Sequence, residues 1–108
     1  MTDDKRRTTD GRSASEADLT IDPASGQQRD YIVLSAEERA KGFVRPVRKR
    51  YVHEKCGGLT VMTQALAETY ARQPTFYSGT FCCHCREHFP VGAEGEFVWD
   101  GTAEKVGT

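Results

Sequence analysis

Large apolar residues are almost absent from the first 30 positions and recur in short runs after them. Residues 1–30 contain only Leu19 and Ile21 among the large aliphatic residues, in a stretch rich in Asp, Arg, Ser, Thr and Gly. Such a segment cannot bury enough apolar surface to offset the entropy that it loses on ordering. The pattern predicts a disordered tail over residues 1–30 and one folded domain over residues 31–108.

Two helices are predicted within the folded part. Ser35 and Glu38 have the spacing of a capping box, and Gly42 ends the short helix that follows them. A second helix of about 12 residues is indicated by apolar residues at spacings of three and four, with Thr60 or Thr63 as its N-cap. These apolar residues are Leu59, Met62, Leu66 and Tyr70.

The remaining apolar runs favour strands. Residues 45–53, 75–81 and 96–99 are rich in β-branched and aromatic residues and lie next to turn-forming residues. Short strands that alternate with turns favour antiparallel pairing. We therefore predict a small α+β fold of antiparallel strands, with the second helix between the first two strand segments.

The strongest chemical signal is a set of metal-ligand residues at regular spacing. His53 and Cys56 form one X-x-x-X pair, Cys82 and Cys85 form another, and 25 residues separate the pairs. Two such turns supply the four ligands of a closed tetrahedral zinc site. Gly57 follows the first pair, where a metal-binding turn often needs a positive φ. The pattern predicts structural zinc bound by one imidazole and three thiolates.

Other ligand arrangements remain open from the sequence. His88 could replace His53 as the fourth ligand, and two disulfides are a further alternative. Cys83 is predicted to be a small buried residue that, like His84, faces away from the metal. Without an export signal the cysteines face a reducing compartment, which favours metal over disulfides.

Length and composition explain the need for a metal. The chain has 108 residues, of which 37% are hydrophobic, and the foldable part is shorter still. A core of that size seldom supplies more than about 3–5 kcal/mol and commonly needs a metal or disulfide staple. No apolar run approaches the roughly 18 residues of a membrane span. We expect a cytoplasmic protein with no membrane contact.

Charge is unevenly distributed along the chain. Seven Lys or Arg residues and one acid lie between positions 39 and 55, whereas the last 22 residues contain five acids and one lysine. The basic strand (Arg45, Arg48, Lys49 and Arg50) could contact phosphates, with Tyr51 or Phe43 available for stacking. It could equally be a protected edge strand, or it could pair with the acidic C-terminal end.

Positions 34–102 resemble a group of small zinc-ribbon-like proteins of tailed bacteriophages and actinobacteria. The likeness lies in residues 34–48 and in the segments Tyr-Val-His-x-x-Cys-Gly, Ala-Leu-Ala-Glu-Thr-Tyr-Ala-Arg, Thr-Phe-Cys-x-x-Cys and Phe-Val-Trp-Asp-Gly-Thr. The resemblance implies a structural zinc ribbon in a phage-like cytoplasmic protein. It implies no established activity.

Catalytic interpretations find little support in the sequence. There is no phosphate loop, no Ser/His/Asp constellation and no His-Glu-x-x-His motif. A site of four protein ligands also leaves no open position for a substrate or water. We expect no enzyme and no small-molecule substrate. The two functional hypotheses are a nucleic-acid-binding accessory protein and a protein interaction or assembly module.

Overall fold

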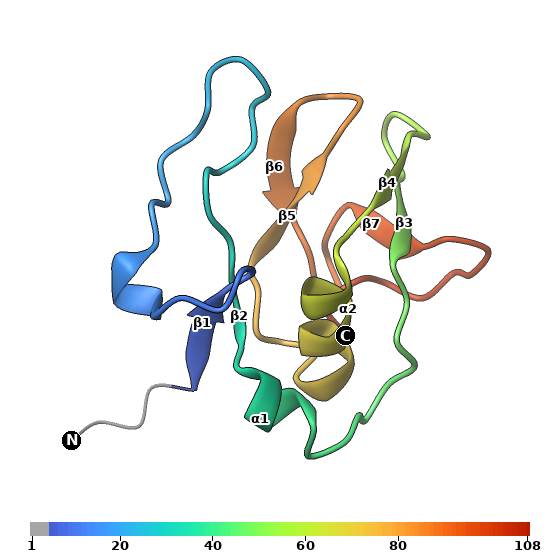
Figure 1. The fold of residues 1–108 in the computed structure, drawn as a ribbon. Helices are drawn as coiled ribbons and strands as arrows, with labels where there is room; N and C mark the ends of the chain where they lie inside the picture. Colours follow the sequence, from blue (N-terminus) through green and yellow to red (C-terminus); the bar gives the residue numbers. More distant parts are fainter. Residues whose placement is uncertain (1–4) are drawn as a thin grey trace.

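The computed structural model describes residues 5–108 and contains short elements joined by turns (Figure 1). The described elements are β1 (Arg6–Thr8), the 3-10 turn η1 (Ala14–Glu16), β2 (Ile32–Leu34), α1 (Ala36–Arg39), β3 (Arg50–His53), β4 (Leu59–Val61), α2 (Gln64–Arg72), β5 (Gly79–Cys82), β6 (Glu87–Pro90) and β7 (Phe97–Trp99). Every strand pair among them is antiparallel. The predicted small α+β class is confirmed.

Two hairpins dominate the part of the chain beyond residue 49. In the first, β3 pairs with β4 and, on its other side, with β7, so that β3 is the central strand of three. In the second, β5 pairs with β6, with Phe81 opposite His88. The two hairpins stand beside each other with their turns at the same end (Figure 1). Strand β3 begins at Arg50, so residues 45–49 of the predicted strand lie outside it.

Helix α2 connects the hairpins, as the sequence predicts, but it is shorter than expected. Thr63 is its N-cap and accepts a hydrogen bond from the Leu66 N–H, whereas Leu59 belongs to β4. Isolated helices of nine residues are marginal in water, so packing must stabilise this one. Ala67, Tyr70 and Ala71 provide that packing, because each is at most 3% exposed.

The core between the hairpins is aromatic. The Tyr51 ring meets Phe97 and Trp99 edge to face, with ring centroids 5.4 and 6.4 Å apart. Its hydroxyl donates a 2.5 Å hydrogen bond to the carbonyl oxygen of Phe81 on β5. Edge-to-face aromatic pairs contribute about 0.5–1.5 kcal/mol each beyond the area that they bury. Tyr51 therefore links the three-stranded sheet to the second hairpin.

Helix α1 has the predicted cap and is held against α2. The Ser35 hydroxyl accepts from the N–H of Glu38, and Gly42 adopts a φ of +113° shortly after the helix ends. Arg39 forms a 2.6 Å ion pair with Glu68 of α2. Neither α1 nor α2, the α-helices of the described part, is long and apolar enough to cross a membrane.

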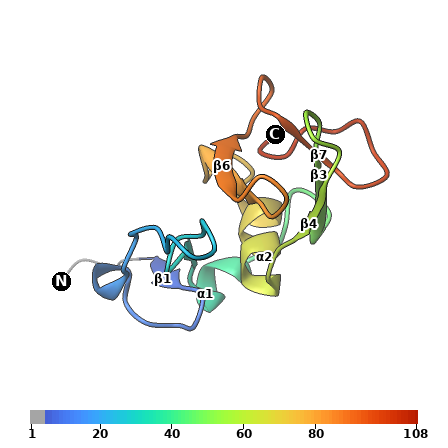
Figure 2. The same cartoon turned by 90° about the horizontal axis from the view of Figure 1, so that it is seen from above.

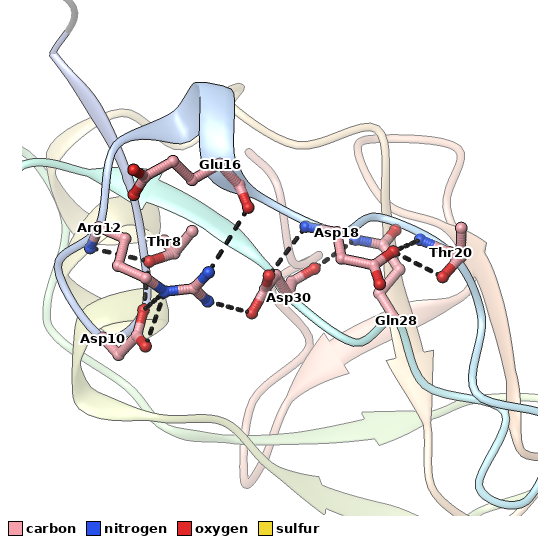
Figure 3. A network of polar contacts seen from close by, with 8 residues as sticks. All are labelled: Thr8, Asp10, Arg12, Glu16, Asp18, Thr20, Gln28 and Asp30. Atoms are coloured by element: carbon pink, nitrogen blue, oxygen red, sulfur yellow. Dashed lines mark hydrogen bonds and ion pairs between the residues drawn. The ribbon is translucent and has the colours of Figure 1, made fainter.

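Residues 5–31 form an N-terminal arm that lies along one side of the domain (Figure 2). Its strand β1 pairs with β2, and a chain reversal between residues 20 and 29 is closed by backbone hydrogen bonds. Polar contacts hold the arm together: Asp30 accepts from Arg12 and from the Asp18 N–H at 2.7 and 2.8 Å (Figure 3).

The disordered tail predicted for residues 1–30 stays a prediction, and the structure describes residues 5–30 with short elements and polar contacts. Leu19 and Ile21 are about half exposed, so apolar burial does not order the arm. Hydrogen bonds among Asp, Arg and Thr side chains replace that burial, and a hydrophobicity pattern does not reveal them. The part of the tail prediction that concerns residues 1–4 lies outside the described residues.

Candidate metal centre

The first hairpin turn begins at the last residue of β3. The Gly57 N–H donates a 2.7 Å hydrogen bond to the carbonyl oxygen of His53, and the next N–H, that of Gly58, points at the Cys56 Sγ at 3.3 Å. Gly57 has a φ of +73°, the left-handed conformation that glycine adopts without steric cost. This geometry directs both ligand-type side chains to the same side of the turn.

The second turn, at the end of β5, repeats the backbone hydrogen bond and the positive φ, but its N–H to sulfur contact is to the first ligand-type residue rather than the second. The Arg86 N–H donates a 2.7 Å hydrogen bond to the carbonyl oxygen of Cys82, and the Cys85 N–H points at the Cys82 Sγ at 3.4 Å. Arg86 has a φ of +59° and is the one described residue other than glycine with a positive φ. Arg86 therefore occupies the position that Gly57 occupies in the first turn.

The two turns bring four metal-ligand side chains together. One ligand atom each from His53, Cys56, Cys82 and Cys85 lies within 4.8 Å of the other three. The Cys56 and Cys82 sulfurs are 3.6 Å apart, as are the Cys85 sulfur and the His53 Nδ1. In a tetrahedral zinc site with Zn–S near 2.3 Å and Zn–N near 2.0 Å, such pairs are separated by about 3.5–3.8 Å. The donor set and its spacing therefore fit a metal ion.

Close packing fixes the two turns against each other. A side chain at Gly58 would collide with the His84 ring, because a Cβ built there lies 2.2 Å from its Cδ2. The Cys83 N–H also donates to the Thr60 hydroxyl of β4 at 3.1 Å. The four ligand-type side chains are thus held by backbone and packing contacts as well as by their own mutual contacts.

His53 is the most constrained member of the group. Its ring is 2% exposed and stacks between Phe89 and Phe97 at centroid distances of 4.4 and 4.8 Å. Its Nε2 lies 2.8 Å from a carboxylate oxygen of Glu96. A carboxylate bound there retains the proton on Nε2 and leaves the Nδ1 lone pair directed at the sulfurs, which is how metal-ligating histidines are commonly oriented.

Glu96 is the site residue that sequence reasoning missed. It precedes β7, whose Phe97 lies opposite His53 in the sheet, and this pairing brings the carboxylate to the imidazole. An acid at the start of a strand has no distinctive sequence signal. Once β7 is paired with β3, however, Glu96 is the residue just before the paired segment and therefore lies next to His53.

The electrostatics of the group favour a positive charge. The Gly58 N–H, followed by neighbouring thiols and His53, lowers the pKa of Cys56 to about 7, whereas burial raises the pKa of Cys85 to about 12. Burial opposes protonation of His53, but hydrogen bonds from its ring to Glu96 and Cys56 outweigh this and raise its pKa above the ordinary value. An environment that stabilises a proton beside thiolates and a carboxylate also stabilises a metal cation.

Cys83, His84 and His88 lie outside this group. Cys83 faces away from it, as predicted, but it is exposed rather than buried, and its thiol donates to the Leu59 carbonyl oxygen at 3.2 Å. The prediction of burial was wrong because the bond from its N–H to β4 places Cys83 on the outer side of the turn. His88 is directed at the Tyr31 hydroxyl, 2.8 Å away, so the arrangement with His88 in place of His53 is not the one the structure has.

Two of the four basic residues proposed to contact phosphates are already paired. Arg48 forms a 3.0 Å ion pair with Glu104 and lies 4.8 Å from the centre of the Trp99 ring. Arg50 lies 3.5 Å from Asp100. The acidic C-terminal end thus pairs with the basic segment, one of the interpretations open from the sequence.

The other two basic residues face solvent. Arg45 and Lys49 are exposed, and the bonds of the Arg45 guanidinium are to main-chain oxygens. Among the aromatic residues considered for stacking, Phe43 is 46% exposed whereas Tyr51 is 2% exposed. The suggestion that Tyr51 could stack on a base was wrong, because its ring fills the core between the hairpins.

Comparisons of the chain with protein-family models, with curated proteins and with solved structures gave no match. The four side chains and their geometry are therefore the basis for a metal centre in this protein.

Proposed function

We propose that this protein is a zinc-ribbon-like module in which one Zn²⁺, bound by His53, Cys56, Cys82 and Cys85, joins two hairpins. The observation behind this proposal is the convergence of one imidazole and three thiols within 4.8 Å at the tips of two similar turns. Three sulfur ligands and one nitrogen ligand suit Zn²⁺ among the common divalent ions. When bound, the ion supplies a cross-link between segments that are far apart in the sequence.

The role of the metal is structural in this proposal. Four protein ligands complete a tetrahedral shell and leave no position at which a substrate or water could be activated. Zinc affinities of about 10–16 kcal/mol in small peptides exceed what a core of this size supplies alone, so binding can drive folding. The module is therefore not an enzyme in this proposal.

Elemental analysis and circular dichroism test the metal assignment. Protein purified under reducing conditions should contain one zinc per chain, and removal of the zinc by a chelator should unfold residues 43–99. Protein without metal, or an unchanged spectrum after chelation, would sink the proposal.

For the biological role, we propose single-stranded nucleic-acid binding by the segment between α1 and β3. Phe43, Arg45 and Lys49 are exposed on this segment, which combines an aromatic face with two cations. Bases stack on aromatic side chains while cations contact the backbone, and this binding weakens with salt. The pairing of Arg48 and Arg50 with acids restricts the contact surface to the other two cations.

A protein interaction or assembly module is the second candidate. Its supporting observation is that Val44, next to Phe43, is 59% exposed, so the segment also presents apolar surface to solvent. A protein partner could cover these side chains without any phosphate contact. This candidate needs no free cations, and the internal pairing of Arg48 and Arg50 is compatible with it.

Fluorescence anisotropy with labelled single-stranded oligonucleotides at increasing salt separates the candidates. Nucleic-acid binding predicts an affinity that falls between about 50 and 200 mM salt, with further losses in Phe43→Ala and in Lys49→Gln. Glu87→Gln, at an exposed position on β6 in the other hairpin, is a control that should not weaken binding. Undetectable binding at low salt would favour the protein-partner candidate.

A further inference from the structure

A cavity of about 260 Å³ lies between the N-terminal arm and the rest of the domain, apart from the metal centre. We call it the arm cavity. Residues 27–29 of the arm form one wall, and Met62, Leu66 and Phe81 contribute to the opposite wall, which β4, α2 and β5 build. A dry engineered cavity of about 150 Å³ holds one benzene ring, whereas pockets for drug-sized ligands begin near 300 Å³. The arm cavity therefore suits a single ring with one or two substituents.

One polar group of the cavity lacks a partner. The Tyr70 side chain is buried, and its hydroxyl forms no hydrogen bond with the described part of the chain. Burial raises the pKa of this phenol, whereas the nearby Thr80 hydroxyl, which also lines the cavity, acts in the opposite direction. A buried hydroxyl without a partner costs about 1–3 kcal/mol. An oxygen of a bound ligand can remove this cost.

The charge of the lining restricts the ligand. Arg29 is the one charged residue among the described residues that line the cavity, and none of the lining residues is an acid. The guanidinium is held by bonds to the Thr20 hydroxyl and the Ile21 carbonyl oxygen at 2.9 and 3.0 Å, and it also interacts electrostatically with the Asp18 carboxylate outside the cavity. A cation at one wall, and an opposite wall that mixes apolar side chains with the hydroxyls of Thr60, Thr63 and Thr80, favour an anionic group on a ring with a polar substituent.

The wall from the arm is built into the fold. Asp18 binds the Thr20 hydroxyl at 2.6 Å and Asp30 binds Arg12 at 2.7 Å, so that the chain on both sides of Arg29 is fixed (Figure 3). Farther along, a side chain at Gly26 would meet the Arg86 carbonyl oxygen at 2.0 Å, because the arm packs directly on the second turn. The cavity therefore has two walls before any ligand enters.

We propose that the arm cavity binds a monocyclic aromatic carboxylate with an oxygen substituent on the ring. The ring packs on Met62, Leu66 and Phe81, the carboxylate pairs with Arg29, and the ring oxygen bonds to the Tyr70 hydroxyl. This binding site is separate from the proposed zinc and nucleic-acid sites, although its wall from β4, α2 and β5 belongs to the part of the fold that the zinc is proposed to hold together. The sequence predicted no small-molecule substrate. The proposed compound is a bound ligand that undergoes no reaction.

Titration calorimetry of the zinc-loaded full chain with 4-hydroxybenzoate tests the proposal. A compound of this size should bind with a Kd on the order of 1 mM, because small ligands gain a limited free energy per atom. Benzoate, which lacks the ring oxygen, and 4-hydroxybenzamide, which lacks the charge, should each bind about tenfold more weakly.

Two variants assign the contacts. Arg29→Gln should weaken 4-hydroxybenzoate about tenfold and leave 4-hydroxybenzamide unchanged, whereas Tyr70→Phe should weaken 4-hydroxybenzoate and leave benzoate unchanged. Arg29 is exposed, so Arg29→Gln should retain the fold, and Lys5→Gln, at an exposed position of the same arm outside the cavity, serves as the control. No saturable binding up to about 20 mM, or variants that weaken all three compounds equally, would overturn the proposal.

Discussion

The two metal-site turns have the same backbone geometry but different chemistry. Both close with a 2.7 Å hydrogen bond to the carbonyl oxygen of the first ligand, and both place the residue after the second ligand at positive φ. The first turn uses an imidazole held by Glu96 and a glycine at the left-handed position. The second uses two thiols and an arginine there. The comparison shows that ligand spacing dictates backbone shape, whereas the surroundings decide which side chains are tolerated.

The different surroundings account for these choices. His53 stands in an aromatic stack between Phe89 and Phe97, where a planar ring fits and a thiol would leave a void. Arg86 lies where the arm presses Gly26 on its backbone, so contacts from outside the turn can hold a conformation that costs an ordinary residue about 1–2 kcal/mol.

Loss of a thiol from either turn should have the largest effect. Cys82→Ser or Cys56→Ser should abolish stoichiometric zinc and unfold both hairpins, because the proposed ion joins them. Zinc content by elemental analysis and the far-ultraviolet dichroism spectrum measure this. Cys83→Ser is the matched control, since this exposed thiol faces away from the group, and zinc loss in that variant would contradict the ligand assignment.

The imidazole of the first turn provides the next test. His53→Ala should retain weak, exchangeable zinc and lose most of the thermal stability, since water replaces the missing ligand. Glu96→Gln should lower zinc affinity about 10- to 100-fold, because the carboxylate orients the ring. Competition with a chromophoric chelator measures both affinities. His88→Ala should match the wild type, and dependence of zinc content on His88 instead would reverse the assignment.

The buried Tyr51 hydroxyl, which joins the two hairpins, should make the stability of the protein sensitive to alkaline pH. Burial raises the pKa of Tyr51 from 10 to about 12, so the unfolded chain loses this proton first. The resulting stability is complete below pH 10 and is lost as the pH rises from 10 to 12, a change of about 2–3 kcal/mol. Urea unfolding at pH 8, 10 and 11 measures this loss. Tyr51→Phe should reduce the slope without removing it, because burial also raises the pKa values of Tyr70 and Tyr77. An equally steep loss in that variant would show that Tyr51 does not contribute.

Substitution of the two residues at positive φ should change the stability least. The direction of each change follows from the backbone strain. Gly57→Ala should destabilise the protein by about 1 kcal/mol, because a Cβ disfavours the left-handed conformation. Arg86→Gly should be neutral or stabilising by up to about 1 kcal/mol, because it relieves the same strain. Thermal unfolding of the zinc-loaded proteins measures both. A destabilised Arg86→Gly variant would show that the arginine side chain contributes contacts of its own.

The ligand group was predictable because short-range spacing determines it. Two X-x-x-X pairs require two tight turns, and the structure brings His53, Cys56, Cys82 and Cys85 together at such turns. The presence of helix α2 was also predictable, because Met62, Leu66 and Tyr70 are spaced by the three or four residues of a helical turn. Leu59 continues the period by coincidence, because pairing with β3 takes this residue into β4.

The remaining features depend on long-range contacts that have no local pattern. Glu96 and His53 are 43 positions apart in the sequence, and only the pairing of β7 with β3 brings them together. The N-terminal arm is ordered by polar side-chain bonds, such as that from Arg12 to Asp30, which hydropathy does not detect. The partners of Arg48 and Arg50 also come from the distant C-terminal end.

The unequal burial of the four ligand-type residues determines how an ion enters and leaves. Cys82 is fully buried and His53 nearly so, whereas Cys56 is exposed. If an ion is bound as proposed, an incoming chelator or acceptor protein should meet the Cys56 sulfur first, and exchange should begin by replacement of that ligand. In the proposed zinc-bound protein, metal transfer should therefore be one-sided, and the rate at which zinc is released should depend on the concentration of the competing ligand.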